Sequence, residues 1–165
     1  MASGQTLARW SALHGTPPAS NPATFNTRNA HPVLEFDTTT SEAVYFEGVL
    51  PRNYAGGGVT IALHWLAASA TSGSVVWGAS MERHDEASLD LDADSFAAEV
   101  LSAASGAPGT TGMLRIASIA LTNGAQMDNL AAGESFRLQI ARKPADAGDD
   151  MAGDAQLLKV EMRET

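Results

Sequence analysis

The chain has 165 residues, a length typical of one domain, and 44% of them are hydrophobic, which is enough for a folded core. The absence of cysteine excludes disulfide bonds, thiolate metal sites and a cysteine nucleophile. The formal net charge is −9, whereas nucleic-acid binding needs Lys and Arg to neutralise phosphates. No apolar run reaches the roughly 18 residues that a membrane-spanning helix needs. We therefore expect neither nucleic acid nor a membrane as a partner.

Residues 1–31 differ in composition from the rest of the chain. They contain Arg9 and Arg28 but no acidic residue, so this segment carries +2 and the remainder −11. The stretch GTPPASNPATFNTRNAHP has four prolines, which interrupt helices and sheet ladders. Only TLARWSALHG has helical spacing, with Leu7 and Trp10 on one face. We predict an extended N-terminal arm over residues 1–31 that rests on its own body or on a neighbouring subunit.

From residue 32 onward, apolar and polar residues alternate with the period of a β-strand. The clearest runs are VTIALHW, SVVWGASMER, ESFRLQIAR and AQLLKVEMR. The residues that we expect on their inward faces are Val59, Ile61, Leu63, Trp65, Val75, Trp77, Ala79, Met81, Phe136, Leu138, Ile140, Leu158, Val160 and Met162. EAVYFEGVL and VLEF are also strand-like. MLRIASIAL has apolar residues in both phases, which predicts a strand covered on both sides.

Turn signals separate these runs, in ATSGS, GAPGTTG, TNGAQ and KPADAGDD. Residues 96–104 are compatible with a strand or with a helix capped by Asp94 or Ser95. About eight short strands without alternating helices are typical of a sandwich or barrel. We predict an all-β fold, an antiparallel β-sandwich of jelly-roll type over residues 32–165, preceded by the arm.

Three consecutive glycines, Gly56, Gly57 and Gly58, precede the run VTIALHW. A phosphate-binding loop places its glycines after a strand and before a helix, so that helix N–H groups face the phosphate. Here the glycines precede a strand and no Lys-Ser or Lys-Thr follows. We therefore predict a corner between two strands, in which the glycines supply positive φ angles.

No motif predicts a metal site or a reaction. Asp90, Asp92 and Asp94 imitate the start of a calcium loop, but its sixth position is Ser95 and its twelfth is Leu101. The four histidines are not in zinc-ligand spacing, and no serine lies in a G-x-S-x-G motif. We expect no cofactor, no metal ligand and no catalytic residue, hence no enzyme. Calcium binding by HDEASLDLDADS or DAGDDMAGD, and a Ser-His-Asp set that converges only in space, stay open.

The three tryptophans divide into two groups. Trp65 and Trp77 are in phase with aliphatic neighbours, which favours the core over a sugar-stacking surface. Trp10 lies outside the alternating region, so we interpret it as an intermolecular anchor.

Three long runs carry a resemblance: HPVLEFDTTTSEAVYFEGVLPRNYAGGGVTIALHWLAASATSGSVVWGASMER, AGESFRLQIARKPAD and MAGDAQLLKVEMRE. Over residues 31–165 the chain resembles small structural proteins of tailed bacteriophages. The resemblance implies a jelly-roll-like capsid decoration (cement) protein on the virion, assembled in the host cytoplasm. Such a homotrimer would bind the outside of the capsid and bridge subunits of the major capsid protein.

On this hypothesis the arm contacts the capsid through Arg9, Trp10, Phe25 and Arg28, while the sandwich forms the trimer. Deletion of residues 1–31 would then abolish capsid binding and leave the sandwich folded. Two alternatives come from other classes. One is a carbohydrate-binding module on the virion that attaches to host or surface glycans. The other is a sandwich-fold hydrolase, for which only the general presence of Ser, His and Asp speaks.

Overall fold

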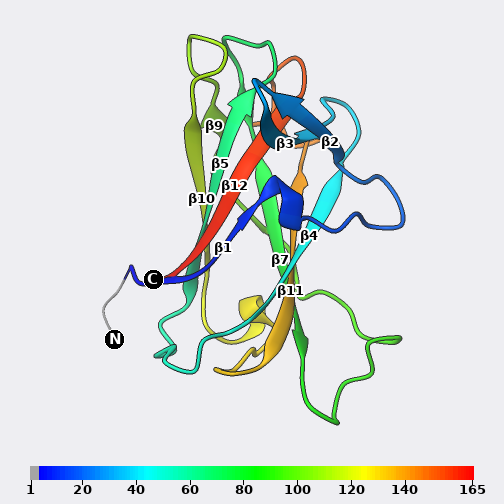
Figure 1. Ribbon diagram of the computed structural model, residues 1–165, viewed down its shortest axis with the longest axis vertical. Helices are drawn as coiled ribbons and strands as arrows, with labels where there is room; N and C mark the ends of the chain where they lie inside the picture. Colours follow the sequence, from blue (N-terminus) through cyan, green and yellow to red (C-terminus); the bar gives the residue numbers. More distant parts are fainter. Residues whose placement is uncertain (1–3) are drawn as a thin grey trace.

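Two antiparallel sheets packed face to face make up residues 4–165, the part of the chain that the computed structural model describes (Figure 1). Sheet A has the strand order β10-β5-β12-β3-β2, and β1 pairs with the other part of β12. Its strands are β1 (Thr6–Ser11), β2 (Thr24–Arg28), β3 (His31–Phe36), β5 (Val59–Ala67), β10 (Arg115–Leu121) and β12 (Ala155–Glu164).

Sheet B has the strand order β4-β11-β7-β8. Its strands are β4 (Ala43–Val49), β7 (Trp77–His84), β8 (Val100–Leu101) and β11 (Ser135–Arg142). A short ladder joins β6 (Ser74–Val75) to β9 (Ser105–Gly106), and the two helical turns, η1 (Ala12–His14) and η2 (Ala125–Met127), are 3-10 helices. No helix in the described range is long and apolar enough to cross a bilayer.

The longer strands from β3 to β12 alternate between the two sheets: β3, β5, β10 and β12 belong to sheet A, and β4, β7 and β11 to sheet B. Each connection therefore crosses from one sheet to the other, as in a jelly roll. This confirms the predicted all-β class and the antiparallel β-sandwich of jelly-roll type.

The core lies between the sheets and follows the period-two pattern of the sequence. The predicted inward residues of β5, β6, β7 and β11 are all 0% exposed: Val59, Ile61, Leu63, Trp65, Val75, Trp77, Ala79, Met81, Phe136, Leu138 and Ile140. Trp65 and Trp77 pack edge to face with their ring centroids 6.2 Å apart. The prediction that these two tryptophans belong to the core is confirmed, so neither offers a surface to a sugar.

The N-terminal segment is part of the sandwich, and this corrects the predicted arm. β1 runs antiparallel to β12, and β2 runs antiparallel to β3. Leu7 and Trp10 belong to the core, although three residues separate them. A β-bulge between Thr6 and Ala8 adds one residue to β1, so both side chains turn inward. The three-residue separation of Leu7 and Trp10, which resembles helical spacing, therefore results from a β-bulge in a strand.

Two further strands depart from the sequence expectations. β10 is an edge strand whose outward residue Ile116 is 51% exposed, so it is not covered on both sides. In β12 the register shifts between Leu157 and Lys159, so that Leu157 is buried and Leu158 only half-buried. By sequence, residues 96–104 are compatible with a strand or a helix. The strand is correct, and it is limited to the two residues of β8, Val100–Leu101.

The three glycines lie in the connection from β4 to β5, so the corner interpretation is confirmed. Gly56 has φ +90° and Gly58 has φ +85°, whereas Gly57 does not have a positive φ. A Cβ atom on Gly58 would lie 2.7 Å from the carbonyl oxygen of Leu121. The chain can therefore pass close to the end of β10 only with glycine at this position.

Candidate functional site

The outward face of sheet A is hollowed at two adjoining places, which together we call the sheet A groove. The first hollow, of about 400 Å³, is lined by Arg9, Trp10, Ser11, His64, Lys159, Val160 and Glu161. The second, of about 430 Å³, is lined by Arg28, Asn29, His31, Val33, Leu66, Gly112, Leu114 and Leu158. Leu158 and Lys159 are neighbours on β12, and His64 and Leu66 are successive outward residues of β5. The two hollows therefore follow one another along a single sheet face.

The strand register fixes the polar side chains of the first hollow in rows across the sheet. Ser11 on β1 lies opposite Lys159 on β12, which lies opposite His64 on β5. One row further along, Arg9 lies opposite Glu161. Because side chains of directly opposed residues are neighbours on a sheet face, these donors and acceptors from three strands line one hollow.

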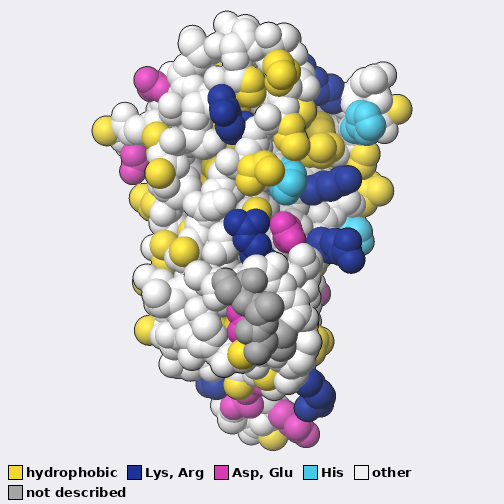
Figure 2. All heavy atoms as spheres, turned by 90° about the vertical axis from the view of Figure 1, so that its left-hand side faces the viewer, with side chains coloured by type: hydrophobic (Ala, Val, Ile, Leu, Met, Phe, Trp, Pro, Cys, Tyr) yellow, Lys and Arg dark blue, Asp and Glu magenta, His cyan; other side chains and the backbone are white. Residues whose placement is uncertain are grey.

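Charges in the groove are mostly positive. Glu161, its one carboxylate among the described lining residues, accepts a hydrogen bond from the Thr6 hydroxyl at 2.5 Å and lies 3.8 Å from an Arg163 nitrogen. Arg9 and Lys159 are exposed and form no ion pair with any described residue. Figure 2 looks onto the side where β10, β5, β12 and β1 lie, and Lys, Arg and His side chains gather near its middle.

In the second hollow, Arg28 is held against the end of β5. Its Nη1 donates to the carbonyl oxygen of Ala67 and to Oε1 of Gln156, each at 2.8 Å. The Gln156 amide in turn donates to Glu35 Oε1 at 2.7 Å. The guanidinium is thus positioned by neutral oxygens, and its positive charge is kept beside the hydrophobic Leu66, Leu114 and Leu158.

Part of the outward face of sheet B is covered by the chain itself. The Arg137 guanidinium carbon lies 4.5 Å from the ring centre of Tyr45 and 4.9 Å from that of Phe96. Phe96 comes from the segment between β7 and β8, which is tied to β7 by a hydrogen bond from the Ala97 amide to the Met81 carbonyl. The Tyr45 and Phe96 rings thus each have one side occupied by Arg137.

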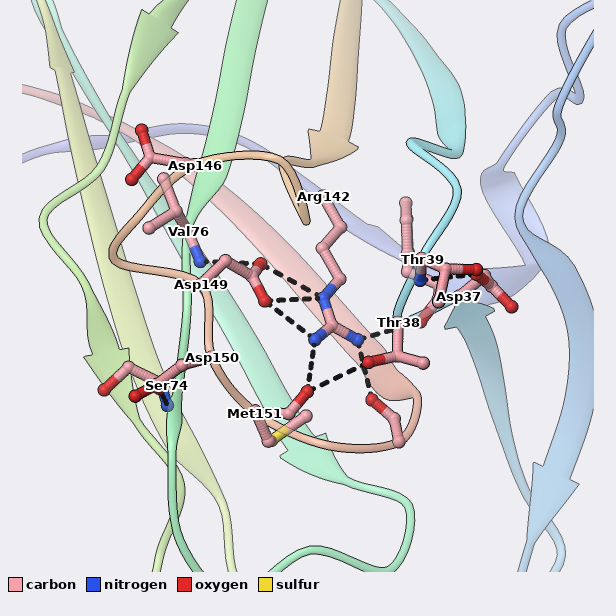
Figure 3. Close-up of polar contacts among 12 residues, drawn as sticks. Asp37, Thr38, Thr39, Ser74, Val76, Arg142, Asp146, Asp149, Asp150 and Met151 are labelled. Carbon is pink, nitrogen blue, oxygen red and sulfur yellow. Dashed lines mark hydrogen bonds and ion pairs between the residues drawn. The ribbon is translucent and has the colours of Figure 1, made fainter.

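The acidic loops use several of their carboxylates within the fold. Asp149 pairs with the buried Arg142 at 2.8 Å, and its Oδ2 accepts the Val76 amide (Figure 3). Asp150 accepts the Ser74 amide, and Asp90 accepts that of Asp92. Among residues 4–165 no group of three or more His, Asp or Glu side chains could hold a metal ion.

The four predicted contact residues do not form one surface. Arg9 and Arg28 line different hollows of the groove, and Phe25 is 54% exposed on β2 beside another hollow. Trp10 is only 8% exposed, and its indole Nε1 donates to the Glu47 carbonyl at 2.9 Å. Trp10 packs edge to face against Phe136. Its interpretation as an intermolecular anchor is wrong, because the ring belongs to the core.

Sequence reasoning missed Ser11, His64 and Lys159. The alternation does place His64 and Lys159 on outward faces, as predicted for their strands. It does not say that β5 and β12 are neighbours or that Ser11 belongs to a third strand beside them. That information lies in strand pairing between residues that are far apart in the chain.

Comparisons with known proteins identify the fold. No protein-family model and no curated protein matches this chain. Among solved structures, it is similar to the CBM22-1 xylan-binding domain of Xyn10C from Paenibacillus barcinonensis, with a TM-score of 0.53, 15% identity and coverage of 99% of this chain and 96% of that one. The CBM22-2 xylan-binding domain of the same protein has a TM-score of 0.50, 12% identity and coverage of 92% of both chains.

The C-terminal CBM6 of LamC, a marine laminarinase from Zobellia galactanivorans, is also similar, with a TM-score of 0.50 and 9% identity. The similarity covers 94% of this chain and 98% of that one. These likenesses span 92–99% of this chain. At identities of this size they show a shared β-sandwich fold.

Proposed function

We propose that this protein is a non-catalytic carbohydrate-binding module whose ligand lies along the sheet A groove. The observation that carries the proposal is the groove itself, two adjoining hollows of about 400 and 430 Å³ on the open face of sheet A. A polysaccharide is a long chain with hydroxyl groups at short intervals, so it suits an elongated open surface. Ser11, His64 and Lys159 offer hydrogen-bonding groups to such hydroxyls.

The fold supports the same proposal. The structures that this chain resembles are named as xylan-binding domains and as a family-6 carbohydrate-binding module. Fold alone does not determine function, so the proposal depends on the site.

The carboxylate content of the groove favours binding over glycoside hydrolysis. Hydrolysis commonly needs two carboxyl groups on either side of the bond to be cleaved. The described lining has one carboxylate, Glu161, and that group is held by Thr6 and Arg163. The same argument speaks against a glycosidase with two carboxylates in this groove.

Electrophoresis in native gels that contain dissolved polysaccharides tests this proposal. The panel includes xylan, laminarin, a mixed-linkage glucan, galactan and acidic polysaccharides. We expect at least one polysaccharide to retard the wild-type protein, and the double variant His64→Ala/Lys159→Ala to lose most of that retardation. Gln139→Ala is the matched control, because Gln139 points outward from the central strand β11 of the other sheet. Unretarded wild type, or equal retardation of wild type and double variant, would contradict the proposal.

As a second candidate function, we propose that the protein is a capsid decoration protein of a virion. Leu13 is 69% exposed and Phe25 is 54% exposed, and both line a hollow with Pro17, Pro22 and Val44 beside β3 and β4. An exposed apolar surface of this kind suits a protein partner, here the major capsid protein. We expect Leu13→Ser/Phe25→Ser to lower the occupancy of the protein on capsid shells, and light scattering to give the mass of a trimer. A monomer that does not bind shells would exclude this role and leave the glycan proposal untouched.

A further inference from the structure

The cations of the groove differ from the other cations of the chain. Of the ten Lys and Arg residues, five lie within 4.0 Å of a carboxylate in the described structure: Arg83, Arg137, Arg142, Lys143 and Arg163. Three of the remaining five, Arg9, Arg28 and Lys159, line the groove. Cations that form no described ion pair are therefore concentrated in the sheet A groove.

The net charge of the groove is opposite to that of the molecule. Its described lining has three of the ten Lys and Arg and one of the nineteen Asp and Glu, which gives +2 against −11 for the rest of the chain. Its one carboxylate, Glu161, already lies beside Arg163. A surface of this kind attracts an anion locally while the rest of the protein repels it.

We infer that the ligand of the sheet A groove is an acidic polysaccharide, a polyuronate whose carboxylates pair with Arg9, Lys159 and Arg28. This inference rests on the proposed function and names its substrate class. The three cations come from β1, β12 and β2, and they occupy both hollows. They can thus meet successive charges of one chain laid along the face.

The lack of an open aromatic ring in the groove supports a charged ligand. Trp10 is the only Phe, Tyr or Trp among its described lining residues, and its ring is buried. A neutral sugar would offer only hydroxyl groups to Arg9 and Lys159, and no charge to pair with theirs. A carboxylate would bring both a strong acceptor and a full opposite charge to the same side chains.

The arrangement of the cations favours carboxylates over denser anions. A phosphate or sulfate group carries several strong acceptors and is commonly held by a cluster of arginines. Here Arg9 lies one row away from Lys159 and on a different strand, and Arg28 is in the other hollow. The three cations thus lie on three different strands and in two hollows, and this distribution suits a polymer with one charge on each sugar. Single-stranded nucleic acid commonly stacks its bases on exposed aromatic rings, and the described lining has no exposed Phe, Tyr or Trp ring.

Titration calorimetry with matched pairs of polysaccharides tests the inference. The probes are polygalacturonate, alginate and glucuronoxylan, each with a derivative whose carboxyl groups have been reduced to alcohols. We expect at least one acid form to bind at least tenfold more tightly than its reduced derivative. The difference should shrink strongly between 50 mM and 500 mM NaCl, because salt screens exposed charges. Heparin and single-stranded DNA serve as densely charged comparisons.

Substitutions of cations test whether the groove is responsible for the preference for the acid form. Arg9→Gln/Lys159→Gln should lower the affinity for that acid form at least tenfold with an unchanged melting temperature. Arg52→Gln should not, although Arg52 is also an exposed cation without an ion pair in the described structure. Equal affinity for acid and reduced forms would overturn the inference while leaving the proposed function intact. Tighter binding of heparin or DNA through the same residues would overturn the assignment of a carboxylate ligand. Binding to no polysaccharide would overturn both this inference and the proposed carbohydrate-binding function.

Discussion

Arg142 is a single residue that holds the long connection between β11 and β12 to the sandwich. It is 0% exposed, and its guanidinium donates to Asp149 and to the carbonyl oxygens of Met151 and Gly153 (Figure 3). A buried ion pair contributes modestly as a pair, but loss of one partner leaves a charge without compensation in the protein interior. Arg142 therefore acts as a structural centre of this end of the molecule.

We predict that Asp149→Ala lowers the free energy of unfolding by about 3–5 kcal/mol, the range found for broken buried pairs. Arg142→Met/Asp149→Ala should lose less than the sum of the two single variants, because no unpaired charge is left. Urea unfolding at pH 7 measures all three. An Asp149→Ala protein within 1 kcal/mol of wild type would show that the pair does not stabilise this connection.

Asp37, in the turn after β3, is held in its ionised form by local hydrogen bonds. Its Oδ1 accepts the Thr39 hydroxyl at 2.7 Å and the Thr40 amide at 2.7 Å. The Thr39 hydroxyl and these backbone amides lower the pKa of Asp37 from 3.8 to about 2. Because the pKa is lower in the folded than in the unfolded chain, ionised Asp37 stabilises the fold above about pH 4, and this is lost as the pH falls through about 2.

Asp37→Asn should therefore be less stable than wild type at neutral pH, and the difference should disappear between about pH 4 and pH 2. Thermal unfolding of both proteins over this pH range measures the effect. Thr39→Val removes the largest cause of the pKa shift, so its stability should depend less on pH in the same interval. A difference between wild type and Asp37→Asn that does not change with pH would contradict this account.

At the scale of elements, β1 is the strand on which the fold and the site both depend. Its inward residue Trp10 packs on Phe46 and Phe136, and its outward residues Arg9 and Ser11 line the groove. Truncation of residues 1–31 would remove β1 and β2 together and expose an edge of β12. The earlier expectation that the truncated protein stays folded does not fit this structure.

We predict that Trp10→Ala lowers the free energy of unfolding by about 3–5 kcal/mol, as for other large-to-small changes in a core. Trp10→Phe keeps most of the ring contacts but loses the hydrogen bond to Glu47, so it should cost about 1 kcal/mol. Chemical denaturation compares both with wild type. A truncated chain lacking residues 1–31 that unfolds with wild-type stability would show that β1 is dispensable.

The glycine corner between β4 and β5 offers a matched pair of substitutions. Gly56 and Gly58 both have positive φ, but a Cβ on Gly56 meets nothing within 4 Å, whereas one on Gly58 meets the Leu121 carbonyl oxygen. Gly56→Ala should cost about 1 kcal/mol through backbone conformation alone, and Gly58→Ala clearly more, because β5 and β10 must also separate. Melting temperatures of the two variants decide this, and equal values would mean that the close approach is unimportant.

The elements also show how far sequence reasoning reaches. Strands with regular alternation, such as β5 and β7, could be predicted with the correct inward face because one face of each is fully buried. β1 and β12 contain bulges, and a single added residue reverses the phase of everything beyond it. For that reason Leu7 and Trp10 had helical spacing, and Leu158 was expected in the core in place of Leu157.

The site was less predictable than the fold. Arg9 and Arg28 were singled out by the absence of acidic neighbours in the first 31 residues, and both line the groove. Lys159 and His64 are 95 positions apart in the chain, and they meet because β12 pairs with β5. A period-two pattern reports which face a residue occupies, but it contains no information on which strand lies beside it.

For the whole molecule, the two proposals use different surfaces. The groove lies on the open face of sheet A, and the apolar hollow with Leu13 and Phe25 lies beside β3 and β4. Part of the face of sheet B is covered by the chain's own segment with Phe96. A protein that is acidic overall, with three of the five cations that form no described ion pair lining one groove, can bind an anionic polymer there.

Chemical-shift mapping by NMR tests the central claim most directly. A ¹⁵N-labelled sample is titrated with an oligosaccharide of the polysaccharide that retards the protein best. The account predicts that the perturbed amides concentrate on β1, β5 and β12 around Ser11, His64 and Lys159. Perturbations confined to sheet B or to residues 85–99, or none at saturating oligosaccharide, would contradict a glycan site in the sheet A groove.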